Sequence, residues 1–368
     1  MKSLLHIALA AACLVTLGCG APTEDTAPAV DAPPPPEGTD THNVDVLAPG
    51  VYFLHEAGAV TVMSNALVIE NEDDVVVVDS NVTPQAAEGL LNTIAGITSK
   101  PISYLINSHY HFDHAHGNQA FPPGVLIVGH EYTRERLAAE DALDDATFVD
   151  FKQLFRGNLE TMASDHATAE GSGDGATALA LTQQMTLLQA HIEAMDTVVA
   201  TPPTVTLEDR LTLHRGSREI QLLHVGRGHT GGDVVVYLPA EKILFTGDLL
   251  VAGPSYMGDA FVDEWVETLD RIKEIPFETI APGHGMPFTD RSLIDKVQKY
   301  YADLWDTTVA MRADGVSALE AALRVDMSAH QGDLGQFASP LLPGGILEPG
   351  IYPAAVMRIY DLLDERGE

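Results

Sequence analysis

Cysteine is almost absent from this chain of 368 residues. Cys13 and Cys19 are the only two, and both lie close to the N-terminus. The rest of the chain therefore has no disulfide and no thiolate ligand for a metal, so any metal site there must use His, Asp and Glu. A Gly-x-Ser-x-Gly segment, the turn that carries the nucleophile of many serine hydrolases, is also missing. Its absence weakens a serine-hydrolase interpretation.

Basic residues are scarce as well. The chain has 20 Lys and Arg against 53 Asp and Glu, which gives a formal net charge of −33. Such a surface repels phosphate backbones, which proteins bind by neutralising them with Lys and Arg. We therefore expect a small-molecule substrate and no nucleic-acid partner. Hydrophobic residues make up 45% of the chain, enough for most of it to fold into a globular structure.

The N-terminus has the features of a targeting segment. Lys2 precedes an apolar run, Leu4–Leu17, which is too short to span a bilayer comfortably. The run leads to Cys19 in a segment similar to a bacterial lipoprotein box, although Thr16 replaces the usual Leu. We expect residues 1–19 to be a signal peptide with Cys19 lipidated; a plain secretory signal is the alternative. The protein would then be periplasmic, lipid-anchored in the cell envelope or secreted, with membrane contact only through the anchor.

Residues 20–43 are rich in Pro, Thr and Asp, and we expect a disordered tether there. Residues 44–368 then form the folded domain. Short apolar runs predict strands at 51–54, 60–69, 75–78, 102–106, 125–128, 204–207, 211–214, 219–223, 234–238, 242–245 and 279–280. Helical patterns cover 84–97, 131–143 and 259–272. They also predict a helical insertion at about 144–200 and a helical tail at about 290–368. Strands in two half-sets separated by helices suggest two facing sheets with helices outside.

The strongest chemical signal is the segment His109-Tyr110-His111-Phe112-Asp113-His114, which directly follows an apolar strand. Three imidazoles and a carboxylate within six residues are hard to explain as surface residues. Zinc accepts such nitrogen and oxygen ligands where no thiolate is available. On a loop, His109 and His111 can face one ion while Asp113 and His114 face a second.

This His-x-His-x-Asp-His segment resembles the defining motif of the metallo-β-lactamase superfamily. Three further motifs of that family follow in order: Gly228-His229-Thr230, Gly247-Asp248 and Gly283-His284-Gly285. The resemblance runs from about Val51 to Phe288 and implies an α/β fold, a four-layer αββα sandwich. Asp79, at the end of a Val-rich strand, matches an acidic position that lies behind the ligands in that family.

The resemblance also implies how the ligands are shared between two metal ions. One ion takes His109, His111 and His229, and the other takes Asp113, His114 and His284. Asp248 bridges the two ions. Zinc, two ions per chain, suits hydrolysis, and iron or manganese also fits these ligands. We interpret the nearby His116 and His224 as structural or supporting residues rather than ligands.

Two cations close together lower the pKa of a shared water, so that hydroxide exists near neutral pH. We expect metal-bound hydroxide to attack the carbonyl of an ester, thioester, lactone or amide, with Asp113 orienting it and moving its proton as the catalytic residue. A bridging Asp248 in place of cysteine separates the chain from antibiotic-hydrolysing subgroups with a cysteine ligand. It resembles the thioesterase and lactonase-like branches. Tyr256 and Met257, after the bridging residue, are candidates for the mouth of the site.

Three other functions remain open. The first is a true β-lactamase, which hydrolysis of a chromogenic lactam would reveal. The second is a diiron redox protein of the same fold. Such proteins use a flavin-binding partner domain, which we do not expect after Glu368. They also have a carboxylate-rich first motif, whereas His111 is present here. The third is a metal-binding or structural envelope protein without activity, against which the complete ligand set argues.

Overall fold

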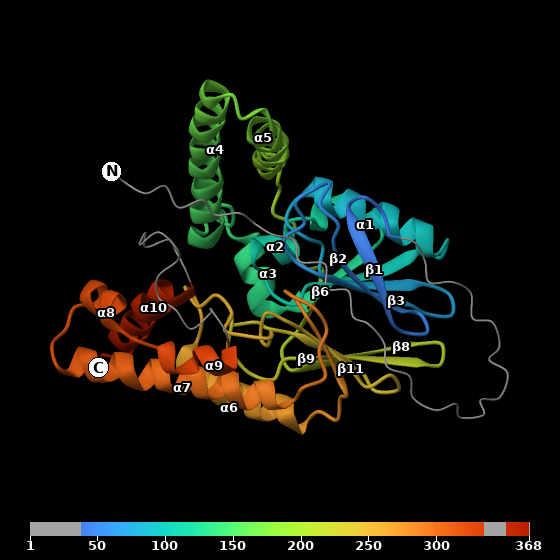
Figure 1. The fold of residues 1–368 in the computed structure, drawn as a ribbon. Coiled ribbons are helices and arrows are strands. Elements are labelled where there is room, and N and C mark those ends of the chain that lie inside the picture. Colours follow the sequence, from blue (N-terminus) through green and yellow to red (C-terminus); the bar gives the residue numbers. More distant parts are fainter. Residues whose placement is uncertain (1–37, 335–350, 368) are drawn as a thin grey trace, which may run out of the picture. The chain divides into compact units, whose positions relative to one another are not determined.

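The computed structural model describes residues 38–334 and 351–367 (Figure 1). The fold below is that of the described residues in the unit Pro36–Glu368. The expected leader, Cys19 and most of the expected tether lie outside the described residues. None of the described helices is long and apolar enough to cross a membrane.

The first sheet begins antiparallel and continues parallel. Strands β1 to β4 pair antiparallel in sequence order, and β4 to β7 pair parallel. Its seven strands lie in the order β1 (His42–Ala48), β2 (Val51–Glu56), β3 (Ala66–Glu70), β4 (Val75–Val78), β5 (Ile102–Ile106), β6 (Leu126–His130) and β7 (Val205–Leu207). Because β4 is buried on both faces, every position in Val75–Val78 is apolar.

The second sheet is antiparallel except at one edge. Its strand order, β12-β11-β10-β9-β8, reverses the sequence, and only β11 and β12 pair parallel. Its members are β8 (Arg210–Arg215), β9 (Arg218–Leu223), β10 (Val235–Leu238), β11 (Ile243–Gly247) and β12 (Thr279–Pro282). One hydrophobic cluster contains Phe53 and Leu67 of the first sheet together with Ile220 and Phe245 of the second, so the two sheets pack face to face.

Helices cover the outer face of each sheet. The described helices are α1 (Pro84–Ile97), α2 (Phe112–Ala115), α3 (Glu131–Ala138), α4 (Ala146–Ser172), α5 (Gly175–Met195), α6 (Val262–Glu274), α7 (Ser292–Ala313), α8 (Ala318–Arg324), α9 (Gln331–Leu334) and α10 (Ile351–Arg366), with single 3₁₀ turns η1 (Asn118–Ala120) and η2 (Ser328–His330). Leu90 and Ile94 of α1 pack on the first sheet. Trp265 and Leu269 of α6 pack between the second sheet and α7. These layers confirm the predicted αββα sandwich with a helical insertion and tail.

Helix α6 shows why such a segment becomes the outer layer. Its apolar residues recur at helical spacing, and Trp265, Leu269 and Ile272 are completely buried. Acidic residues occupy its first turn and basic residues its last turn, which suits the helix dipole. The predicted helix started at residue 259, but α6 starts at Val262. Asp259 is left outside the helix, with its side chain directed to the first histidine motif.

Other predicted boundaries also differ from the structure. The tether was expected to continue to residue 43, but β1 begins at His42, whose ring is buried against Asn81. The strand expected at 60–69 is β3 alone, because Met63 has a φ of +68° and ends any extended run. The helix expected at 131–143 ends at Ala138, and an aspartate-rich turn that begins after it leads to Asp145 at the cap of α4.

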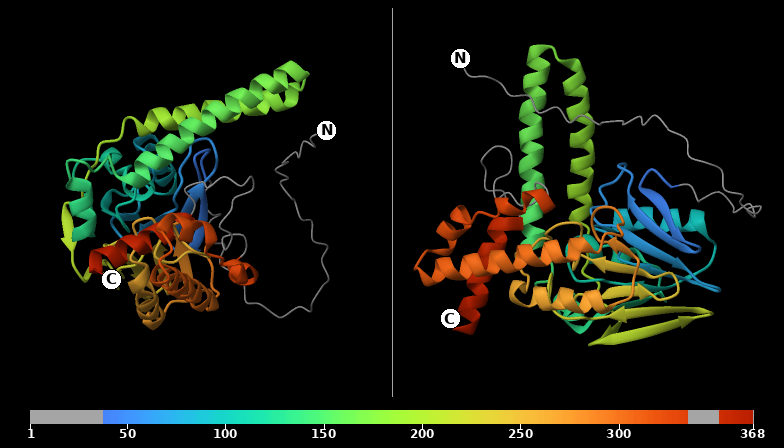
Figure 2. Two further views of the ribbon diagram at one scale, coloured as in Figure 1. Left: turned by 90° about the vertical axis from the view of Figure 1, so that its left-hand side faces the viewer. Right: turned by 60° about the horizontal axis from the view of Figure 1, so that its bottom comes forward.

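The insertion folds as a helical hairpin. Helices α4 and α5 lie side by side, joined at Gly173, which adopts a φ of +77° (Figure 2). Met195 and Phe148, where the hairpin joins the sandwich, pack with Phe112 of the histidine motif. The insertion therefore reaches the segment that carries the candidate ligands.

Candidate metal centre

The predicted ligands meet at the edge where both sheets end. Asp79 follows β4 and His109 follows β5, two parallel neighbours in the first sheet. Asp248 follows β11 and His284 follows β12, the parallel pair of the second sheet. His229 lies in the loop between β9 and β10. Because the carboxyl ends of parallel strands lie together, residues far apart in the sequence share one site.

The first group consists of His109, His111 and His229, all buried. Their ring centroids are 4.6 to 4.8 Å apart and their planes are nearly perpendicular to one another. The Nδ1 of His111 lies 2.8 Å from the Nε2 of His229. Three imidazole nitrogens that converge in this way can bind a single cation between them.

The second group consists of Asp113, His114 and His284. The Oδ2 of Asp113 lies 3.4 Å from the Nε2 of His114 and 3.0 Å from the Nε2 of His284. The two imidazole nitrogens are 3.3 Å apart. His114 is completely buried, whereas the His284 side chain is 38% exposed, so this group opens to solvent on the His284 side.

Asp248 lies between the two groups. Its Oδ2 is 3.7 Å from the Nε2 of His229 in the first group and 3.2 Å from the Nε2 of His284 in the second. Its Oδ1 is 3.4 Å from the Nε2 of His114. The structure therefore brings together all seven predicted ligand residues and places Asp248 between the two groups.

Each buried imidazole of the two groups has a polar partner behind it. The Nδ1 of His109 lies 3.0 Å from the Ser108 hydroxyl, and the Nδ1 of His229 lies 3.0 Å from the carbonyl oxygen of Tyr256. Two further contacts involve carboxylates: His111 Nε2 with Asp259 at 2.9 Å, and His114 Nδ1 with Asp79 at 2.7 Å. Such partners fix the tautomer and ring orientation of metal-binding histidines.

The donor atoms suit a divalent cation. His109 Nε2 and Asp248 Oδ1 are buried without a hydrogen-bond partner among the described residues, although buried polar atoms normally have one. Burial lowers the pKa of His109 well below its usual value and that of His229 to about 4, so both imidazoles are neutral, the form that binds a metal ion. A metal ion would satisfy these atoms, and zinc is the typical choice for such ligands.

The two carboxylates are charged. Burial alone would raise the pKa of Asp248, but the imidazoles of His284 and His114 outweigh burial and hold that pKa well below its usual value. The same two imidazoles, His114 first, lower the pKa of Asp113 against the effect of burial. Two negative charges among converging nitrogens provide the compensation that bound cations need.

Sequence reasoning missed several residues that shape the centre. Asp259 accepts hydrogen bonds from His111 and from the Tyr110 hydroxyl. Asp233 closes the loop that carries His229, because its carboxylate accepts from the backbone N–H and the hydroxyl of Thr230. Both are single acidic residues without a motif around them, so local sequence carries no signal for them.

The other candidate residues near the centre have different surroundings. His116 packs against Phe112 and Phe148 and belongs to none of the metal-binding groups. Met257, a candidate for the mouth, is completely buried in the core instead. Tyr256 does lie near the mouth, with its ring centroid 6.1 Å from that of His111.

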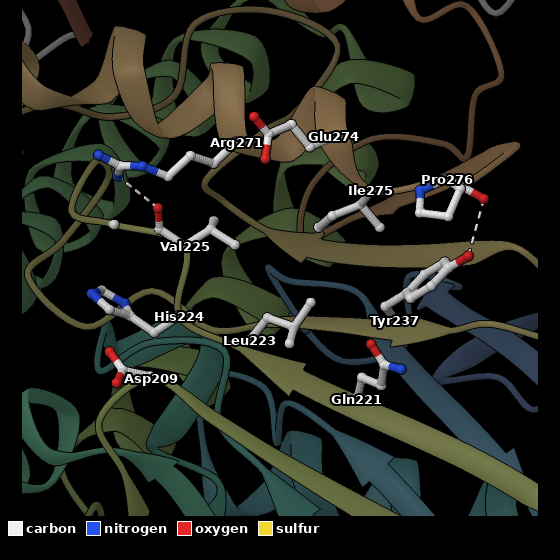
Figure 3. Close-up of a pocket in the computed structure, with 11 residues that line it drawn as sticks. Asp209, Gln221, Leu223, His224, Val225, Tyr237, Arg271, Glu274, Ile275 and Pro276 are labelled. Carbon is white, nitrogen blue, oxygen red and sulfur yellow. Dashed lines mark hydrogen bonds between the residues drawn. The ribbon is translucent and has the colours of Figure 1, made fainter.

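Two cavities among the described residues bear on the location of the site. The larger, about 610 Å³, contains none of the seven predicted ligands (Figure 3). His224 lines it, and the Nδ1 of His224 bonds the Asp233 carbonyl oxygen, which is a structural contact. The smaller, about 270 Å³, adjoins the centre through Asp259 and Tyr256, and Thr147 at the start of α4 also lines it. We therefore place the approach to the metal centre at the smaller cavity.

Comparison with known proteins agrees with this geometry. The sequence profile described as the Metallo-beta-lactamase superfamily matches residues 59–284, a range that contains every predicted ligand. The chain belongs to the metallo-β-lactamase superfamily.

Two relatives of the chain have different functions from each other. A linear primary-alkylsulfatase from Pseudomonas sp. is 25% identical over 279 residues, which cover 71% of this chain and 50% of the relative. The alpha subunit of a 2,4-dinitroanisole O-demethylase from Nocardioides sp. is 24% identical over 266 residues, covering 71% of this chain and 62% of the relative. The chain thus spans about half to three-fifths of the length of these curated relatives.

A solved structure supports the fold. The inverting sec-alkylsulfatase Pisa1 from Pseudomonas sp. superposes with a TM-score of 0.58 at 16% identity, covering 86% of this chain and 49% of that one. At this identity the likeness concerns the fold alone.

Proposed function

We propose that the chain is a metal-dependent hydrolase with two metal ions, most suitably zinc. One ion would be held by His109, His111 and His229, and the other by Asp113, His114 and His284. Asp248 would be shared by both ions. The observation that carries the proposal is the position of Asp248, whose oxygens lie within 3.7 Å of imidazoles from both groups. When bound, such ions acidify water and polarise the bond to be cleaved.

The residues of the chain supply the remaining parts of the reaction. The buried imidazoles hold their rings toward the centre through the partners behind them. Asp113 is both a ligand and the residue that orients the attacking water and moves its proton. Its Oδ2 lies 3.0 Å from His284 on the open side of the centre. Tyr256 and Thr147 line the approach and would contact the part of the substrate next to the reacting bond.

The substrate we propose is a small molecule with a carboxylic ester, thioester, lactone or amide bond. A panel of one substrate from each class, measured with zinc-loaded protein and with protein treated with a chelator, tests this proposal. Turnover that disappears with the metal and returns with zinc supports it. If wild-type protein binds no metal after reconstitution, the hydrolase proposal is wrong.

An alkyl sulfate is the second candidate substrate. The specific observation in its favour is the similarity to the linear primary-alkylsulfatase, which covers 71% of the chain. Release of inorganic sulfate from a medium-chain alkyl sulfate, in the same two metal states, distinguishes it from the carbonyl substrates. Nitrocefin in the same panel tests the β-lactamase alternative, and elemental analysis for iron tests the diiron alternative.

A further inference from the structure

Asp259 joins two consecutive residues of the histidine motif. It is 148 positions from His111 in the sequence, yet its Oδ2 accepts a hydrogen bond from His111 Nε2 at 2.9 Å. The same oxygen accepts a hydrogen bond from the hydroxyl of Tyr110. The His111 side chain is only 4% exposed. A single carboxylate oxygen therefore holds the ring that enters the first metal group.

This contact determines which nitrogen of His111 faces the centre. Because Nε2 donates its proton to Asp259, Nδ1 is left as the acceptor. The Nδ1 atom is the one that lies 2.8 Å from His229 Nε2. His109 and His229 present Nε2 instead, since their Nδ1 atoms contact Ser108 and Tyr256. The first group therefore depends on a ring orientation in which His111 presents Nδ1 to the centre, whereas His109 and His229 present Nε2.

The segment that carries Asp259 is itself held from two sides. The backbone N–H of Phe261 donates to the carbonyl oxygen of Gly228, next to His229, at 2.8 Å. The carbonyl oxygen of Ala260 accepts from Arg358 of α10 at 3.0 Å. The segment that carries Asp259 is thus bonded to the His229 loop and to α10, which makes the position of Asp259 well defined.

Asp79 occupies the corresponding position in the second group. It contacts His114 Nδ1 at 2.7 Å, so each group has one imidazole backed by a carboxylate. The other buried imidazoles, His109 and His229, are backed by neutral oxygens. The two carboxylates therefore form a natural pair of variants, one for each group.

We propose that Asp259 is a positioning residue for the first metal group, which fixes His111 with Nδ1 toward the centre and so raises the affinity of that group for its ion. The proposal rests on the proposed function, since it requires that the group binds a metal. Asp259 lies behind the imidazole and does not need to touch the ion or the substrate.

The test measures zinc affinity in two backgrounds that each retain one group. His284→Ala leaves the first group, and His229→Ala leaves the second. Adding Asp259→Ala should weaken zinc binding about 10- to 100-fold in the first background and leave it unchanged in the second, since a lost partner behind a ligand usually costs that much. Adding Asp79→Ala should weaken zinc binding in the second background, because it removes the partner of His114 Nδ1. Competition with a chromogenic chelator provides the affinities.

Two further variants separate positioning from folding. Asp259→Asn keeps an acceptor oxygen and should lose less affinity than Asp259→Ala, and Tyr110→Phe should lose less still because the contact with His111 remains. The thermal midpoint of metal-free protein is recorded for each. Equal losses in both backgrounds, or a lower midpoint with unchanged affinity of the first group, would overturn the proposal. A wild type that binds no zinc would instead overturn the proposed function.

Discussion

The Nδ1 of His114 lies 2.7 Å from the Oδ2 of Asp79, and both side chains are completely buried. Asp79 directly follows β4, with a φ of +63°. Its carboxylate also accepts hydrogen bonds from the backbone N–H and the hydroxyl of Ser108, which follows β5. One side chain therefore joins the ends of two parallel strands and orients an imidazole of the second metal group.

This relationship predicts a large loss of stability in Asp79→Ala. The variant leaves His114 and the Ser108 N–H buried without their partner, so we expect the free energy of unfolding of metal-free protein to fall by about 3–5 kcal/mol. Asp45→Ala is the matched control. Asp45 pairs with His55 at 3.5 Å but is 47% exposed, so its loss should cost less than about 1 kcal/mol. Denaturant unfolding measures both, and similar losses would contradict the prediction.

Asp248→Ala should lower the metal content more than any other single ligand change. It removes the one side chain whose oxygens approach imidazoles of both groups. Asp113→Asn should reduce turnover more than metal content, since the three histidines of the first group remain. Elemental analysis and steady-state rates on the same preparations check both expectations.

The controls for these variants are His116→Ala and His224→Ala. His116 packs between aromatic rings and His224 bonds a backbone carbonyl, so both variants should retain most of the bound metal. If either lost a full equivalent of metal while His229→Ala lost none, the ligand assignment would be wrong.

The core of the site could be predicted because its residues occur in motifs. His109, His111, Asp113 and His114 lie in one short segment, and His229, Asp248 and His284 each follow or accompany a glycine in the expected order. Short apolar runs between them predicted the strands that carry them. Apolar periodicity depends only on local sequence, which is why β4, β5 and α1 lie where they were expected.

Apart from Asp79, the supporting residues could not be predicted because they act over long sequence separations. Asp259 is 148 positions from His111. Asn65 was placed in a strand, but its backbone and side chain bond the loop at 282–285, a contact that only the folded chain reveals. Met257 follows a tyrosine near the centre, yet it points into the core. Direction of a side chain in a loop depends on tertiary contacts rather than on local pattern.

The leader interpretation has its own test. If Cys19 is lipidated after cleavage, Cys19→Ala or globomycin should block processing and change membrane association. Cell fractionation and the mass of the mature N-terminus measure the two effects. The control is Cys13→Ala, which alters the other cysteine of the leader and should be processed normally. Mature protein found wholly in the cytoplasm would show that the leader interpretation is wrong.

The folded domain should be indifferent to reductant. No cysteine follows Cys19, so no disulfide can stabilise residues 44–368. Metal-free protein should therefore melt at the same temperature with and without a phosphine reductant. Metal-free protein is used because thiol reductants also bind zinc. A midpoint that falls by several degrees would contradict the prediction.

Gly283 lies where a side chain would fill the metal centre. A Cβ added at Gly283 would lie only 2.3 Å from Asp248 Oδ1 and 2.8 Å from His114 Cε1. The backbone cannot move away easily, because Gly283 N–H donates to Gly247 and its carbonyl accepts from Asn65, both at 2.8 Å. The added methyl must displace Asp248 or His114 from its ligand position. We therefore expect Gly283→Ala to lose metal binding and turnover.

Gly96→Ala is the control for this substitution. Gly96 is exposed on α1, and a Cβ there meets no atom within 4 Å. Alanine favours a helix over glycine, so this variant should keep its metal and gain about 0.5–1 kcal/mol in unfolding free energy. Zinc titration and denaturant unfolding compare the two variants directly. Since the methyl of Gly283→Ala competes for the space around Asp248 Oδ1, wild-type zinc affinity in that variant would mean that the ions are held somewhere else.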